Sequence, residues 1–106
     1  CHPGLFYFGG RIRSMRVARM AAAAGLECTP HISGTGLGYL YMLHFVSATP
    51  NAGPYHEFKG LSRGIPIQCD TSSLKSEAGR ITVPSGPGDG LDIAPEFLKK
   101  HQVVKA

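Results

Sequence analysis

The polarity pattern is organised around one long uncharged stretch in the middle of the chain. No Lys, Arg, Asp or Glu occurs between Glu27 and Glu57, and the part from Leu37 to Ala48 is apolar at nearly every position. A helix that is apolar all round is buried all round. The pattern therefore predicts a buried helix over about 37–48, with polar residues kept at the two ends of the stretch.

The chain before this stretch predicts a strand followed by an amphipathic helix. Residues 5–8 favour a strand or a strand exit, and Gly9-Gly10 lets the backbone turn tightly into a helix over about 11–24, which Gly25 ends. At 100° per residue, the small side chains and the arginines fall on different sides of this helix. The small side comprises Met15, Ala18, Ala21 and Ala22, and the other side comprises Arg13, Arg16 and Arg19. The small side suits packing against a sheet, and the arginine side suits either a solvated face or a phosphate-binding face.

Two further short strands are predicted around the buried helix. Residues 26–30 have the length of a strand, and Pro30 stops its ladder just before His31. Residues 55–58 follow a loop rich in Pro and Gly and carry Glu57. Alternation of strand and helix predicts an α/β fold, in which sites lie at the carboxyl ends of the strands. His31 and Glu57 are thus placed at neighbouring strand ends.

The character of the chain changes after Phe58. Residues 59–76 mix charges with Gly and Pro, which indicates irregular chain that leaves the core. A short strand over 81–83, an extended segment over 91–93 and a terminal helix over 94–100 are predicted beyond it. We therefore divide the chain into residues 1–62, which form the main α/β part, and a tail of residues 63–106.

Charge and composition narrow the classes of function. The net charge is +4, but much of the positive charge lies on one helix without interleaved aromatics, so we expect no nucleic-acid partner. Three cysteines at unrelated spacings do not form a disulfide framework, which favours a reducing cytoplasm. The longest strongly apolar run, 39–46, is far shorter than the roughly 20 residues of a membrane span. The chain has no initiator Met and no signal-peptide pattern, so we expect a truncated start.

Considered without reference to a family, the residues allow several interpretations of the functional site. His31 and Glu57 suit an acid/base pair, although a structural His and a Glu57–Arg63 ion pair are equally simple interpretations. Cys28, His31, His56 and Glu57 are residue types that bind zinc, but the second half of a zinc motif is missing. The loop 34–38 has the glycines of a phosphate-binding turn without the remaining fingerprint.

A series of short motifs, in order along nearly the whole chain, resembles a known family. The motifs are Pro3, Phe8-Gly-Gly-Arg-Ile, Arg16-Val-Ala-Arg, Thr29-Pro-His31, Pro50-Asn-Ala, Tyr55-His-Glu57 and Gly79-Arg-Ile-Thr-Val-Pro-Ser-Gly-Pro-Gly88. They resemble the C-terminal part of enolase-superfamily enzymes of the mandelate racemase and muconate lactonizing type. The resemblance implies a C-terminal slice of a modified (β/α)8 TIM-type barrel, comprising its sixth to eighth strands. The tail would then return to an α+β capping domain.

The resemblance also implies a chemistry. In such enzymes Mg²⁺ held by three carboxylates stabilises an enediolate, the seventh-strand His is a general base or acid, and the eighth-strand Glu hydrogen-bonds the developing charge. His31 and Glu57 match these two positions, whereas the Mg²⁺ ligands are expected upstream of this chain. We expect a homo-oligomeric acid-sugar dehydratase that acts on a small carboxylate, with a racemase or epimerase, or a non-catalytic fragment, as alternatives.

Two positions depart from the family pattern. An Asp that often follows the sixth-strand Pro, and orients the His, is Gly4 here, and Asp89 occupies a position that is commonly apolar. The first departure leaves His31 without its usual partner. With the metal ligands absent as well, the chain alone is expected to be inactive.

Overall fold

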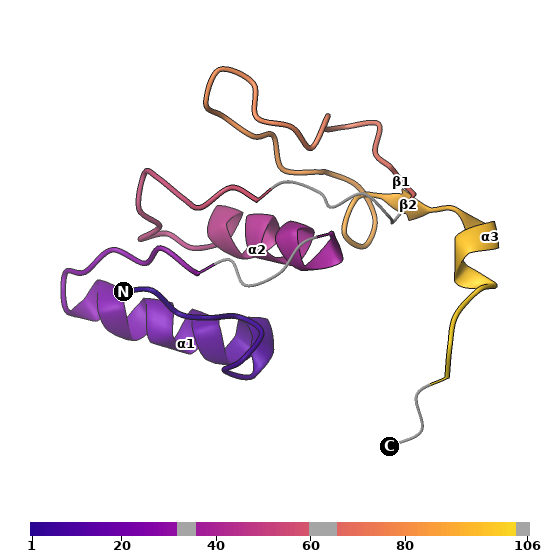
Figure 1. The fold of residues 1–106 in the computed structure, drawn as a ribbon. Helices are drawn as coiled ribbons and strands as arrows, with labels where there is room; N and C mark the ends of the chain where they lie inside the picture. Colours follow the sequence, from indigo (N-terminus) through magenta and orange to yellow (C-terminus); the bar gives the residue numbers. More distant parts are fainter. Residues whose placement is uncertain (32–35, 60–65, 104–106) are drawn as a thin grey trace. The chain divides into compact units, whose positions relative to one another are not determined.

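The structure is a computed structural model that describes residues 1–31, 36–59 and 66–103. The chain divides into two units, Cys1–Leu61 and Ser62–Ala106, and each is described by itself (Figure 1). The first unit contains the two long helices, α1 (Gly10–Ala23) and α2 (Leu37–Ser47). Each lies within one residue of the range that the sequence predicts. None of the described helices is long and apolar enough to cross a membrane.

Three extended segments run parallel to one another in the first unit. Isolated bridges pair Gly4 with His31 and Cys28 with Ala52, both in parallel orientation. The segment from Cys28 to His31 therefore lies between the other two. Because α1 follows the first segment and α2 follows the second, the arrangement confirms the α/β class predicted from the sequence.

Backbone hydrogen bonds hold the middle segment from both sides. On one side the Thr29 N–H donates to Cys1 O at 2.8 Å, and on the other the Cys28 N–H donates to Asn51 O at 2.8 Å. These bonds are evenly directed along the segments, as in a parallel ladder. The middle segment thus takes its position from both neighbours.

The side chain of Asn51 ties the third segment to α1. Its Nδ2 donates to Ala18 O at 3.0 Å and to Leu26 O at 2.9 Å. One acceptor lies inside the helix and the other lies just after it. Asn51 therefore fixes the end of α1 against the extended segments through two hydrogen bonds that no sequence periodicity indicates.

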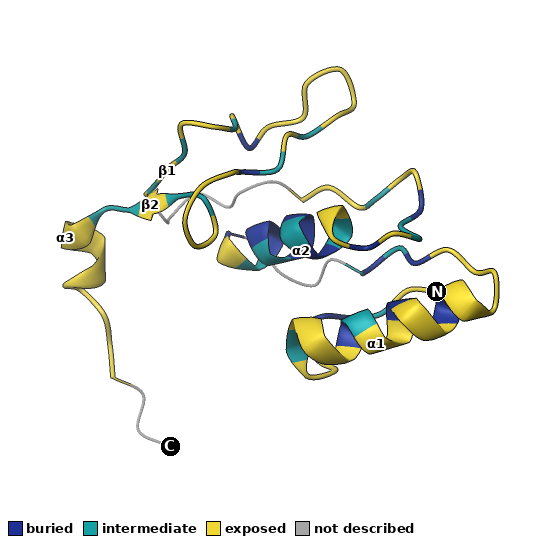
Figure 2. Cartoon of the chain, turned by 180° about the vertical axis from the view of Figure 1, so that it is seen from behind, coloured by how far each residue is buried: buried dark blue, intermediate teal, exposed yellow. Residues whose placement is uncertain are grey.

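A narrow stripe of α1 is buried, and the rest of the helix is exposed (Figure 2). The buried residues are Ser14, Ala18 and Ala21. The predicted small-residue side is thus confirmed at Ala18 and Ala21, whereas Met15 is half-buried and Ala22 is exposed. Small side chains on this stripe let the helix lie close to the extended segments.

α1 begins after a tight turn of two glycines. Gly9 and Gly10 have φ values of 88° and 75°, a region that residues with a Cβ avoid. A Cβ at Gly9 would lie 2.6 Å from Cδ of Arg13. The predicted Gly-Gly turn into the helix is confirmed.

α1 ends at Gly25, which has φ of 69°. The Gly25 N–H donates to Ala22 O at 3.0 Å and the Leu26 N–H donates to Ala21 O at 2.9 Å. This pair of bonds is the Schellman motif, which supplies donors to carbonyl groups that the last helical turn leaves unpaired. The predicted helix stop is confirmed.

α2 is buried over most of its surface, as its uncharged sequence predicts. Figure 2 shows buried and intermediate positions along its length, with exposed residues at its ends. The buried side chains are Tyr39, Leu40, Met42, Leu43 and Phe45. Together they contribute most of the apolar core of the first unit.

Tyr39 anchors the segment that follows the third extended strand. Its fully buried ring meets the ring of Phe58 edge-on, with centroids 5.7 Å apart and planes at 75°. Among the described residues its hydroxyl has no hydrogen-bond partner. Burial raises the pKa of Tyr39 to about 12, because desolvation disfavours the phenolate.

The second unit contains β1 (Ile67–Gln68), β2 (Asp92–Ile93) and α3 (Pro95–Leu98). The two strands pair antiparallel, with Ile67 opposite Ile93. Side chains close the loop between them: Thr71 Oγ1 donates to Ser85 O at 3.1 Å and accepts from the Ser85 N–H at 2.9 Å. The predicted terminal helix is present but is shorter than expected.

Two predicted strands, 55–58 and 81–83, are wrong, and of the two predictions for residues 5–8 the strand exit is the one observed. Residues 5–8 form a turn closed by the Phe8 N–H donating to Gly4 O at 3.2 Å. Residues 55–58 are outside the ladder: the Gly53 N–H makes the last bond, to Cys28 O, and Pro30, the next residue in register on the middle segment, has no N–H to donate to Gly53 O. Residues 81–83 follow an isolated bridge between Glu77 and Arg80 and form no strand.

We expect Gly25→Ala to lower the free energy of unfolding by about 1–2 kcal/mol. A Cβ at this position meets no atom within 4 Å, so the cost comes from the left-handed backbone and not from a clash. Gly25→Asn is the matched control, because Asn tolerates this conformation better and should cost less. Urea unfolding of the intact protein measures both, and equal costs for the two variants would contradict the explanation.

We expect stability to fall at high pH through Tyr39. The folded pKa is raised to about 12 from an ordinary value near 10, so the contribution is complete below pH 10 and is lost as the pH rises toward 12. Tyr39→Phe removes the ionisable group and an unpaired hydroxyl. Between pH 9 and pH 11.5 the free energy of unfolding, measured with urea, should therefore fall less in the variant than in the parent protein. An equal fall in both proteins would show that Tyr39 does not cause the loss of stability at high pH.

Candidate active site

The three parallel segments end at one edge of the first unit. The first ends at Gly4 and the second at His31, and the third leads through Pro54 into the stretch that carries Glu57. Because parallel segments point the same way, the side chains at their carboxyl ends share one edge. This is the kind of edge at which the sequence placed His31 and Glu57.

Backbone pairing fixes the position of His31. Its N–H donates to Pro3 O at 3.0 Å, and it is paired with Gly4 across the parallel bridge. The residue is half-buried. Because Gly4 has no side chain, the position directly beside His31 on the neighbouring segment is left open.

Glu57 lies at this edge through a contact with a residue near the start of the chain. Its Oε1 is 3.7 Å from Nε2 of His2, which is the distance of an ion pair when the imidazole is protonated. The Glu57 side chain is 42% exposed. Arg63, the alternative partner considered from sequence, lies outside the described residues.

His2 is the residue that sequence reasoning missed. Its ring centroid is 5.5 Å from that of His31, with the planes at 60°, and its Nε2 faces Glu57. His2 and Gly4 are two residues apart in an extended segment, so they lie on the same face, and Gly4 is the bridge partner of His31. The alternation of side chains along 2–4 was the signal that could have placed His2 at the site.

The zinc set considered from sequence does not come together. Cys28 and His31 are three residues apart in an extended segment, so their side chains point to opposite faces. Cys28 is buried, and burial raises the pKa of its thiol, although the positive chain terminus acts in the opposite direction. In the part of the chain that the structure describes, no three His, Cys, Asp or Glu side chains are grouped to hold a metal ion.

The same observation bears on Mg²⁺, which the resemblance implies. Mg²⁺ takes oxygen ligands, chiefly carboxylates and water, in octahedral geometry. Over residues 1–31, 36–59 and 66–103 no such carboxylate group is assembled, and Glu57 faces His2 instead. The described residues therefore do not fit a Mg²⁺ site of their own.

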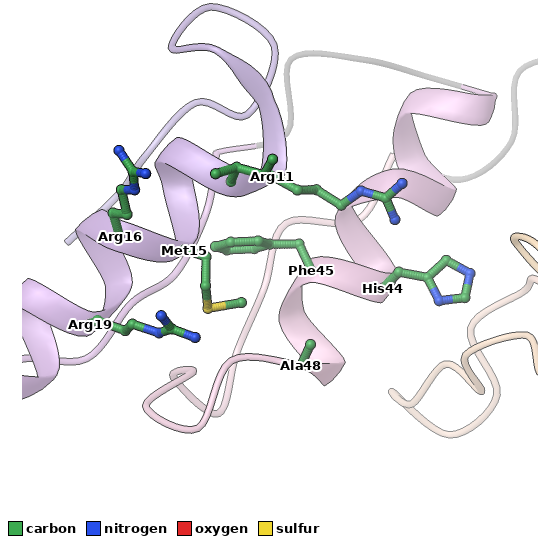
Figure 3. Close-up of a pocket in the computed structure, with 8 residues that line it drawn as sticks. Arg11, Met15, Arg16, Arg19, His44, Phe45 and Ala48 are labelled. Atoms are coloured by element: carbon green, nitrogen blue, oxygen red, sulfur yellow. The ribbon is translucent and has the colours of Figure 1, made fainter.

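The arginines of α1 serve two different surfaces. A groove of about 480 Å³ between α1 and α2 is lined by Arg11, Arg16 and Arg19, and Figure 3 shows Met15 and Phe45 facing one another across it. The guanidinium of Arg11 lies 4.0 Å from the ring centroid of Tyr41, a cation–π contact. Arg13 instead shares a cavity of about 340 Å³ with His2 and Phe8. The groove contains none of the predicted site residues.

Part of the glycine-rich loop lies outside the described residues, and its phosphate-binding interpretation is not supported by the part that is described. Gly36 has φ of 61° and precedes α2. Gly38 is inside α2, and a Cβ there would lie 2.7 Å from the ring of Phe6. The described glycines thus make room for a turn and for close side-chain packing.

Two known proteins are similar to the chain over 95% of its length. One is D-galactarolactone cycloisomerase from Agrobacterium fabrum (strain C58 / ATCC 33970), which is 28% identical over 108 residues. The other is a crystal structure from Roseobacter denitrificans, assigned by its description as a racemase, with 36% identity and a TM-score of 0.74. The chain spans 29% of the length of each relative.

A family model gives the assignment. The enolase C-terminal domain-like family matches residues 1–97, which is most of the chain. The match agrees with the parallel segments and helices of the first unit and with both relatives. The chain therefore belongs to the enolase superfamily, in its mandelate racemase and muconate lactonizing branch.

Proposed function

We propose that the intact protein removes the proton next to the carboxyl group of a small sugar acid, and that this chain supplies acid–base groups for that step. The observation that carries the proposal is the placement of His31 at the shared carboxyl edge, with His2 and Glu57 beside it. A half-buried imidazole at such an edge is reachable from solvent and is held by its backbone. Imidazole exchanges protons near neutral pH, which suits the reaction.

His31 is proposed to act on the proton itself. As a base, it takes the proton from the α-carbon, and the electron pair of the broken C–H bond moves into the carboxylate to give an enediolate. As an acid, it returns a proton, either to carbon or to a departing hydroxide, which leaves as water. Positioned general acid–base groups contribute about 10²–10⁴-fold to a rate.

Glu57 is proposed to act on the charge that develops on the substrate oxygens. Its segment is held by the contact between Phe58 and the buried Tyr39, so the carboxyl group is presented from a fixed base. In the substrate complex, with a proton on its carboxyl group, Glu57 can donate a hydrogen bond to that developing charge, which stabilises the transition state more than the ground state. The Mg²⁺ that the family resemblance implies is assigned to residues of the intact protein outside this chain.

Two outcomes can follow removal of the proton. Loss of a β-hydroxyl group gives dehydration, the outcome expected from sequence, and return of a proton gives racemisation or isomerisation. The names of the relatives, a cycloisomerase of D-galactarolactone and a racemase, favour the second outcome and a sugar-acid substrate. We further propose that the first unit is a three-segment slice of a (β/α)8 barrel and that the second unit returns to a capping domain.

We expect His31→Asn to lower the rate of α-proton exchange by at least about 100-fold. Asn keeps the approximate size of the side chain but cannot exchange a proton. The intact protein is incubated with Mg²⁺ and galactarate or gluconate in deuterated water, and deuterium at the α-carbon is followed by NMR. The same spectra distinguish a dehydrated product from an isomer.

The control is His101→Asn, which changes an exposed His whose ring Nδ1 is 3.0 Å from Leu98 O in the second unit. It should leave the exchange rate unchanged. If His31→Asn exchanges the α-proton as fast as the parent protein does, His31 has no role in the mechanism. A parent protein with no exchange on any sugar acid would favour the non-catalytic alternative.

We expect Glu57→Ala to slow exchange more than Glu57→Gln does. Gln retains an N–H donor at nearly the same position, whereas Ala retains none, and loss of one such donor costs about 10²–10³-fold in kcat. The measurement is kcat and KM for exchange in both variants. Equal kcat values would show that Glu57 does not act as a donor to the substrate.

A further inference from the structure

His2 occupies a place between the two predicted site residues. Its Nε2 is 3.7 Å from Oε1 of Glu57, and its ring centroid is 5.5 Å from that of His31. It reaches both because it lies two residues before Gly4 on the same face of the first segment. Neither neighbour is adjacent to it in sequence.

The open position at Gly4 explains why His2 can make these contacts. Gly4 is the partner of His31 across the parallel bridge and has no side chain. The ring that the first segment brings to His31 is therefore the one at position 2. The site therefore has an imidazole, and not a carboxylate, beside His31.

The charge of His2 has a definite effect on both neighbours. Protonated His2 neutralises the Glu57 carboxylate and also lies as a like charge beside the His31 ring. A nearby positive charge disfavours protonation of an imidazole. Protonated His2 therefore favours the unprotonated form of His31, which accepts a proton.

We propose that His2 is a positioning residue of this site, which pairs with Glu57 and holds His31 ready to act as a base. The proposal rests on the function proposed above and adds a residue to it. His2 does not touch the substrate in this scheme, and it acts through its two neighbours. No metal ion is required for the interaction.

Other charged groups around this edge set the conditions for a test. Arg13 of α1 and Cys1 share a cavity with His2. His56 precedes Glu57, and α2 contributes Tyr39, which is neutral below pH 10 because burial raises its pKa to about 12. These groups are the same in the parent protein and in the variants below, so a shift in one variant reports the side chain that was changed.

The first test is the pH dependence of kcat for α-proton exchange in His2→Gln. Gln keeps a polar side chain of similar length but carries no charge, so the acid limb should move to higher pH by about one unit. A purely structural role would lower kcat at every pH and leave the limb in place. That result, or an unchanged profile, would overturn the proposal.

The second test adds a charge instead of removing one. A Cβ at Gly4 would lie 3.4 Å from the ring of Phe8, an ordinary contact, and Gly4→Asp adds a carboxylate at the position paired with His31. It should move the acid limb in the same direction as His2→Gln, whereas Gly4→Asn, of the same shape without charge, should leave it in place. A shift shared by Asp and Asn would overturn the electrostatic explanation.

A third measurement separates this proposal from the proposed function. In the intact protein labelled at histidine, the ring signals of His31 are followed by NMR against pH without substrate. The pH at the midpoint of this titration should be higher in His2→Gln than in the parent protein and unchanged in His101→Gln. An unmoved midpoint overturns the role of His2 whatever the activity, and a moved midpoint together with an active His31→Asn variant overturns the proposed function alone.

Discussion

Backbone pairing of the middle extended segment is the constraint on which the candidate site depends. Thr29 and His31 donate to the first segment, and Cys28 donates to the third, so the position of the His31 backbone is set from two sides. The pairing is short and consists of isolated bridges. Its support comes from the two helices: a stripe of small residues lets α1 approach closely, and α2 supplies the large apolar side chains.

Local signals in the sequence predict the helices well. Gly9, Gly10 and Gly25 require positive φ, which marks the start and end of α1, and the absence of charge marks α2 as buried. The strands are predicted less well, because a short apolar run does not reveal where a neighbour will pair with it. At 55–58 the aromatic residues Tyr55 and Phe58 favour a strand, but Pro30 on the middle segment has already ended the ladder.

The residues of the candidate site also differ in how well the sequence predicts their positions. His31 follows from a local signal, a strand stopped by Pro30, and its place at a segment end is observed. His2 has no such signal, because its meeting with Glu57 joins residues that are 55 positions apart in the chain. Asn51 is similar, because its two hydrogen bonds, to Ala18 O in α1 and to Leu26 O just after the helix, depend on tertiary structure. Contacts of this kind follow from topology and not from periodicity.

The burial of Cys28 has a consequence for the chemical reactivity of the chain. Thiols react with alkylating agents and oxidants as thiolates, and burial raises the pKa of Cys28 while shielding it from reagents. Cys28 lies in the middle segment, between the two segments that pair with it. Modification of this thiol therefore requires the packing that covers the middle segment to open, so its rate of labelling reports how often that packing opens.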